Sequence, residues 1–148
     1  MIDKRVLERV QRLLELPALI VPLERQRTAL RAERRTTEAK VVRQRVLVLN
    51  ELIDQDERYK SASNQKERDL LMEAALHGDD QWCELSERID QLTTTIERVE
   101  ADLSGLDHER KALKAALERE YASVIEQLHS DRILADVATS RKVRGVDA

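Results

Sequence analysis

The sequence has almost no aromatic residues, and this shortage limits the folds that it can form. Of its 148 residues only 2% are aromatic, namely Trp82, Tyr59 and Tyr121, and there is no phenylalanine. Aromatic side chains normally supply much of the buried area of a compact core. Three glycines and two prolines are few for the turns of a β-sandwich or barrel, and one cysteine excludes a disulfide scaffold. The sequence also lacks the Gly-rich loop that is typical of a Rossmann-type nucleotide fold.

Long apolar runs are missing as well. The longest run is residues 18–21, far short of the roughly 20 residues that a membrane helix needs. The N-terminus opens on Asp3, Lys4 and Arg5, without the apolar stretch and cleavage site of a signal peptide. Together with the single cysteine, these absences predict a cytoplasmic protein with no membrane partner.

Charged residues are abundant, at 37% of the chain, and they are unevenly distributed. Residues 1–48 hold 12 Lys/Arg against 6 Asp/Glu, which gives +6, whereas residues 49–110 hold 7 against 17, which gives −10. A chain rich in Leu, Ala, Glu and Arg is typical of long helices and coiled coils. The charge separation favours a partner that recognises one end, or self-assembly of unlike segments. Solvated helix faces that happen to cluster are the alternative.

Capping and proline signals divide the chain into helices. Pro17 is expected to end a first helix, because the residue before a proline avoids the helical region. Pro22 suits the first turn of the next helix, and Asn64 with Glu67 forms a capping box. We therefore expect helices over about 3–16, 22–59, 65–77, 80–129 and 131–138, followed by a flexible basic tail over 139–148.

The helix over 80–129 carries an unbroken heptad stripe. Its apolar residues alternate steps of four and three, and Arg110 is a polar residue in the same seam. Sustained over more than three heptads, this pattern predicts a coiled coil. The stripe, which we expect to be the seam of an oligomer, consists of Leu85, Ile89, Leu92, Ile96, Val99, Leu103, Leu106, Leu113 and Leu117.

One helix cannot bury such a stripe alone. The helix over 22–59 is its natural antiparallel partner. We therefore expect an all-α fold: a long antiparallel helical hairpin or coiled coil, with short N-terminal and connecting helices. Residues 1–138 would form a single domain that becomes stable by associating with further copies as a homo-oligomer.

Motifs for chemistry are lacking. The sequence has no Walker loop and no nucleophile elbow. His77, His108 and His129 are far apart, and Cys83 has no nearby histidine, so no metal site is expected. We expect no catalytic residue, no cofactor and no small-molecule substrate, and therefore no enzyme.

A basic segment is the remaining candidate site. Arg27, Arg31 and Arg34 lie near one face of their helix, and the arginine guanidinium suits phosphate. The segment has no aromatic residue to stack on bases, so any nucleic-acid binding would use the phosphate backbone with little sequence preference. The candidate nucleic-acid-binding residues are Arg25, Arg27, Arg31, Arg34, Arg35, Lys40, Arg43 and Arg45.

The order of features from Lys60 to Trp82 resembles a known family. A basic residue and a small polar break precede Asn64, Arg68, a Leu/Ala-rich short helix, the pair Asp79-Asp80, Trp82 and a long heptad helix. This arrangement resembles the UvsY-like recombination mediators of phages over about residues 60–128. The resemblance implies an oligomer that binds single-stranded DNA and works with a recombinase or a single-strand-binding protein. It assigns no site residue to this chain.

Two functions follow from the sequence. The first is a non-enzymatic, oligomeric accessory protein that binds single-stranded DNA, similar to a recombination mediator. The second is a coiled-coil scaffold, adaptor or assembly protein with no nucleic-acid role. The geometry of the arginines separates them: outward and unpaired arginines favour the first function, whereas pairing across helices with acidic residues such as Glu84, Glu97 and Glu100 favours the second.

Overall fold

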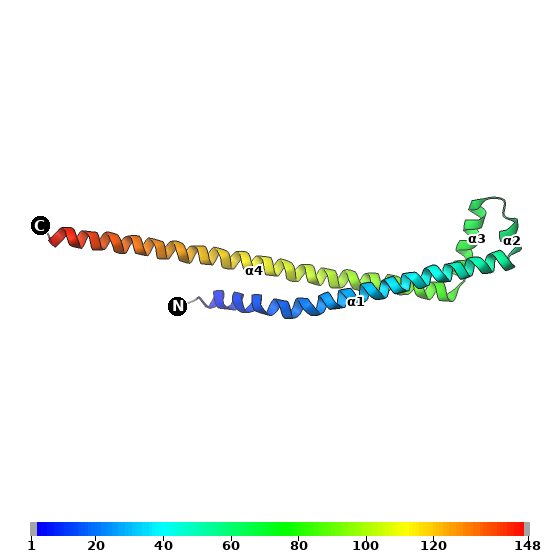
Figure 1. Ribbon diagram of the computed structural model, residues 1–148, viewed down its shortest axis with the longest axis horizontal. Helices are drawn as coiled ribbons and strands as arrows, with labels where there is room; N and C mark the ends of the chain where they lie inside the picture. Colours follow the sequence, from blue (N-terminus) through cyan, green and yellow to red (C-terminus); the bar gives the residue numbers. More distant parts are fainter. Residues whose placement is uncertain (1–2, 147–148) are drawn as a thin grey trace. The chain divides into compact units, whose positions relative to one another are not determined.

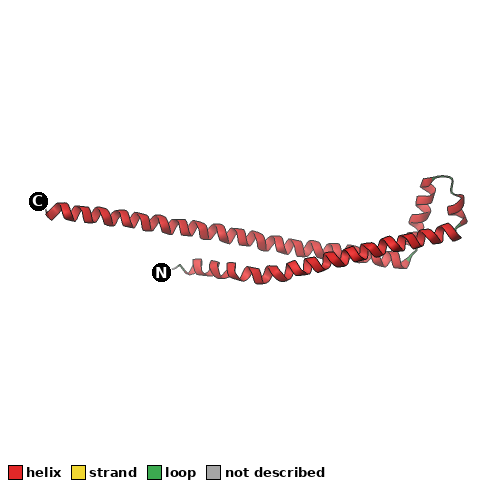
Figure 2. Cartoon of the chain, viewed as in Figure 1, coloured by secondary structure: helices red, strands yellow, loops and turns green. Residues whose placement is uncertain are grey.

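The computed structural model describes residues 3–146, with side chains for residues 3–141, and over that range it is built of helices (Figures 1 and 2). The contacts divide the chain into two compact units. We call residues 3–20 with 104–146 the terminal unit, and residues 21–103 the hairpin unit. The four helices are α1 (Lys4–Gln55), α2 (Glu57–Ser61), α3 (Gln65–His77) and α4 (Asp80–Val146).

Helix α1 continues through both prolines. The prediction that one helix ends at residue 16 and another begins at 22 is therefore wrong. The heptad pattern explains the difference, because Leu16 is fully buried and Leu13, Ile20 and Leu23 extend the same stripe across the prolines. Pro17 is exposed, so its ring lies away from the stripe. A proline inside a helix costs about 3 kcal/mol, and burial of the stripe offsets that cost.

The junction of α1 and α2 lies earlier than predicted. The expected helix 22–59 ends at Gln55, because Asp56 has an extended backbone and caps α2. The Asp56 carboxylate accepts a hydrogen bond from the Arg58 backbone N–H at 2.9 Å. Lys60 Nζ donates to the Asp54 carbonyl at 3.1 Å, which satisfies an acceptor at the end of α1.

Helix α3 has the predicted bounds and the predicted cap. Asn64 Oδ1 accepts a hydrogen bond from the Glu67 backbone N–H at 2.9 Å. Glu67 Oε2 in turn accepts from the Ser63 backbone N–H at 3.0 Å, one residue before the position that a standard capping box uses. The capping prediction is confirmed.

Helix α4 is one continuous element. The predicted break near residue 130 is wrong, and so is the flexible tail over 139–146; residues 147–148 lie outside the described residues. No proline follows Pro22 in the sequence, and no glycine lies between Gly105 and Gly145. Nothing in that stretch therefore stops helical propagation.

The hairpin unit has its core where α1 and α3 meet. Val48, Leu52, Met72 and Leu76 are buried together, and Trp82 packs against them. Further along, α4 packs against α1 with Leu92, Ile96 and Val99 at 1%, 5% and 4% exposure. The prediction of an all-α antiparallel hairpin is confirmed.

The terminal unit pairs the start of α1 with the later part of α4. Leu16 of α1 is fully buried, while Leu106, Leu113 and Leu117 of α4 are half-buried. The predicted seam therefore lies on the face of α4 that packs within the chain. Its role between copies, and the expectation of a single domain and of a homo-oligomer, stay predictions.

Candidate functional site

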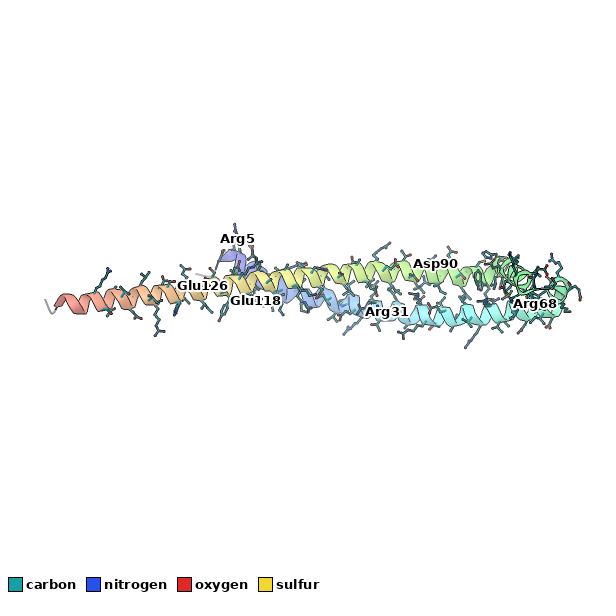
Figure 3. The ribbon with its side chains drawn as sticks, turned by 90° about the horizontal axis from the view of Figure 1, so that it is seen from above. Arg5, Arg31, Arg68, Asp90, Glu118 and Glu126 are labelled. Carbon is teal, nitrogen blue, oxygen red and sulfur yellow. The ribbon has the colours of Figure 1, made fainter. Side chains whose placement is uncertain are left out.

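Ion pairs between α1 and α4 flank the seam of the hairpin unit. Arg31 of α1 (Figure 3) pairs with Glu100 of α4, and both residues are about half exposed. Arg88 Nη2 of α4 lies 2.5 Å from Glu33 Oε1 of α1. When the buried stripe of each helix is assigned to heptad positions a and d, Arg31 and Glu100 both fall at e. Glu33 and Arg88 both fall at g, so the pairs are those of an antiparallel coiled coil.

Three of the eight predicted phosphate-binding residues are engaged within the hairpin unit. Arg31 pairs with Glu100, and Arg34 Nε lies 3.0 Å from Glu38 Oε1 on the same helix. Arg27 and Arg34 are half-buried at position a of the seam. Arg27 Nε is buried without a hydrogen-bond partner among the described atoms. The face predicted to bind phosphate is therefore turned largely toward α4.

The other five predicted residues are exposed, and two of them, Lys40 and Arg45, occupy the positions that flank the seam. None has an acidic partner within 4 Å in the described part of the chain, and all are exposed. They occupy different heptad positions around α1 and so do not form one stripe: Arg25 at f, Arg35 at b, Lys40 at g, Arg43 at c and Arg45 at e.

The outward face of α4 in the hairpin unit is acidic. Asp90 marks this face (Figure 3), and the exposed acidic residues along it are Asp80, Glu84, Glu87, Asp90, Glu97 and Asp102. A nucleic-acid backbone is repelled by such a surface. The hairpin unit thus carries exposed positive charge on α1 and exposed negative charge on α4.

A forked ion pair joins the two helices of the terminal unit. Arg12 Nε donates to Glu109 Oε1 at 2.6 Å and Arg12 Nη2 donates to Glu109 Oε2 at 3.1 Å. These hydrogen bonds hold the pKa of the Glu109 carboxyl below its ordinary value, and they raise the pKa of Arg12. Arg9 pairs with Glu120 in the same unit.

Arg110, which was predicted to be a polar residue in the seam, lies at the surface of α4. Arg110 is exposed and pairs with Asp107 of its own helix, at 2.7 Å between Arg110 Nη2 and Asp107 Oδ1. Lys111 also binds Asp107, and its hydrogen bond lowers the pKa of that carboxyl. Glu109, one residue earlier, faces Arg12 instead. The prediction that Arg110 is a polar residue within the seam is wrong, because its long side chain extends to Asp107 at the helix surface, while Leu106, Leu113 and Leu117 keep the heptad register on either side.

The cross-helix pairs Arg9–Glu120, Arg12–Glu109 and Glu33–Arg88 were not anticipated from the sequence. The sequence does place opposite charges beside the seam of both helices, and these charges could have indicated the pairs. Reading it requires knowing which residue of α1 faces which residue of α4, and the heptad pattern alone leaves that alignment open.

Features that would support catalysis are sparse in the described residues. Within residues 3–146, no three His, Cys, Asp or Glu side chains gather as metal ligands would. None of the helices over that range has the length and apolar character required to cross a membrane. Cys83 is half-buried, and its Sγ lies 3.5 Å from the His77 carbonyl at the end of α3. An open depression of about 590 Å³ borders Val48, Leu52, Asp56, Arg58 and Asp79.

Comparison with known proteins finds no similar family model, no similar curated protein and no similar solved structure. The resemblance to UvsY-like mediators therefore stays a prediction.

Proposed function

We propose that this chain is a non-enzymatic coiled-coil scaffold or adaptor protein. The observation that supports the proposal is the Arg31–Glu100 pair, because it joins the basic segment of α1 to the acidic helix α4. Pairing across helices is the arrangement that distinguishes a structural use of these arginines from a phosphate-binding use. The long apolar seam and the flanking ion pairs are the means by which coiled coils fix partner and register.

The distribution of charge gives further support. The five exposed basic residues without an ion-pair partner are spread around α1 at five heptad positions and share the hairpin unit with an acidic α4 face. Binding to a phosphate backbone requires a concentrated positive surface, since its strength grows with the number of phosphates neutralised. A helical scaffold needs no such surface, and it tolerates mixed charges.

The test is binding of the full chain to a fluorescein-labelled single-stranded oligonucleotide, followed by anisotropy at about 50 and about 200 mM salt. The scaffold proposal predicts no rise in anisotropy at the lower salt concentration. Tight binding that weakens steeply with salt would overturn it.

Single-stranded DNA binding is the second candidate, favoured by the absence of ion-pair partners for the five exposed basic residues among the described atoms. In that case the anisotropy signal depends on Arg35, Lys40 and Arg43, and their combined substitution by Glu abolishes it. Substituting Glu84, Glu87 and Asp90 by Gln is the matched control, because it changes the outward face of α4 and leaves α1 intact. Recombinase or single-strand-binding partners would then be sought.

A further inference from the structure

The terminal unit exposes an apolar surface on one flank of its helix pair. Large apolar residues usually face a core, yet eleven are exposed in the described part of this unit, and six of these, 37% to 75% exposed, lie on one flank. Three come from α1 and three from α4. We call the set the flank patch: Leu7, Val10, Leu14, Tyr121, Ile125 and Leu128.

Heptad positions place these residues on the same side. Val10 of α1 and Tyr121 of α4 are both at position e, and in an antiparallel pair position e of one helix faces position e of the other. Leu7, Leu14 and Ile125 are at b, which lies next to e around the helix. The Arg12–Glu109 pair, at g, occupies the opposite flank of the same unit. The flank patch is therefore a second apolar stripe, separate from the seam.

The flank patch has the size of an interface. Six large side chains that are 37% to 75% exposed give a patch of several hundred Å², with about 600 Å² as its upper figure. Patches on monomers reach about 300–600 Å², and those at the top of this range are often functional. Two copies meeting face to face would bury about 1,200 Å², the lower end of the range for stable protein interfaces.

Helix α4 requires a partner in this region. The α4 members of the flank patch, Tyr121, Ile125 and Leu128, follow the Arg9–Glu120 ion pair and are 70%, 47% and 63% exposed. In proteins most helical stability comes from packing of an apolar face rather than from helix propensity. The chain itself offers no further helix in the described part of this unit.

We infer that the flank patch is the contact between two copies of this chain. A patch that is apolar over its whole width complements itself across a two-fold axis. The exposed charges around it have both signs, Glu118 and Glu126 (Figure 3) with Lys114 and Arg119, so identical patches meet without net like-charge repulsion. The inference deepens the proposed scaffold function and rests on it, because a scaffold of this kind assembles through a defined surface.

The closing experiment measures mass by sedimentation equilibrium from about 1 to 100 µM full chain, where the dimer is expected. Leu14→Glu with Leu128→Glu should raise the dimer dissociation constant by about 30-fold or more. The matched control is Leu70→Glu with Leu134→Glu, since Leu134 is 67% exposed at position d of α4, outside the flank patch, and Leu70 is 58% exposed on α3. That control should leave the dimer intact, with equal helicity in both variants by circular dichroism.

A second measurement does not depend on the folding of a charged variant. In a Cys83→Ser chain, Ile125→Cys should be joined to its own copy by a short bis-maleimide, whereas Leu134→Cys should not. A monomer over the whole concentration range, an assembly of another size, a dimer insensitive to the patch variant, or binding of the monomer to phosphatidylcholine vesicles would each overturn the inference. If the dimer contact is refuted and the chain does not bind the oligonucleotide, the proposed scaffold function still holds. If the chain binds the oligonucleotide through its arginines, the scaffold function is refuted, whatever mass the chain has in solution.

Discussion

Arg12 and Glu109 form a forked ion pair that joins α1 to α4 in the terminal unit, with Arg12 Nε 2.6 Å from Glu109 Oε1. Both residues occupy position g. Glu33 lies three heptads after Arg12 and Arg88 three heptads before Glu109, and those two residues pair in the hairpin unit. The basic residue of the pair is on α1 in the terminal unit and on α4 in the hairpin unit. Each pair favours the antiparallel alignment of the two helices within its own unit.

The Arg12–Glu109 pair predicts an acid-sensitive stability. Arg12 lowers the pKa of Glu109, so the folded chain holds this carboxylate ionised to a lower pH than the unfolded chain. The stabilisation is complete above the ordinary pKa of about 4.3 and is lost as pH falls through the lowered value. Urea unfolding followed between about pH 2.5 and 7 should show a smaller loss of stability at acid pH in Glu109→Gln. Glu118→Gln, an exposed change on the same helix, should retain the full loss (Figure 3). Identical acid slopes for Glu109→Gln and the parent chain would contradict the assignment.

The Arg31–Glu100 pair predicts a rescue by charge exchange. Arg31→Glu places two carboxylates opposite each other at position e and should lower the free energy of unfolding by about 0.5–1 kcal/mol. The double variant Arg31→Glu with Glu100→Arg restores an opposite-charge pair and should recover most of that loss. Urea unfolding of the two single variants and the double variant gives the coupling. A double variant whose loss is the sum of the single losses would show that the two residues do not interact.

The seam predicts a large effect from one buried leucine. Leu92 is 1% exposed on the face of α4 that packs against α1, so Leu92→Ala should cost about 2–5 kcal/mol of unfolding free energy. Leu70→Ala removes the same atoms from a side chain that is 58% exposed and should cost less than about 1 kcal/mol. Because the stripe is buried within the chain, the loss for Leu92→Ala should appear in helicity and melting temperature at every protein concentration. A change in oligomer mass with unchanged helicity would instead place Leu92 between copies.

The strongest sequence pattern gave the most reliable prediction. The stripe from Leu85 to Leu117 recurs too regularly to be a surface feature, and the structure buries or half-buries all of it. The cap at Asn64 was equally readable, since it depends on residues three positions apart. Both predictions use local information, and no knowledge of the partner helix is required.

Predictions that weighed local propensity against packing were less reliable. Breaks were predicted at Pro17 and near residue 130, yet α1 and α4 continue through them. At Pro17 the burial of the neighbouring Leu16 stabilises the helical conformation in spite of the proline. The ion-pair partner of Arg31 depends on which α4 residue lies opposite it, and a heptad pattern does not fix that alignment. The basic segment was therefore identified as a set, while the direction in which each arginine points was not.

Pro17 offers the sharpest test of the continuous α1. In a helix interior, proline lacks the N–H that would donate to the carbonyl four residues earlier, and its ring crowds that carbonyl. Its side chain is exposed, so replacement by alanine removes no buried contact. Pro17→Ala should therefore raise the unfolding free energy by about 1–3 kcal/mol, measured by urea unfolding. Ala18→Gly is the matched control at the neighbouring exposed position and should lower that free energy by about 1 kcal/mol. If the chain instead breaks at Pro17, as local propensity alone suggests, neither substitution lies inside a helix. Pro17→Ala would then destabilise or leave stability unchanged, because a proline in a loop restricts the unfolded chain.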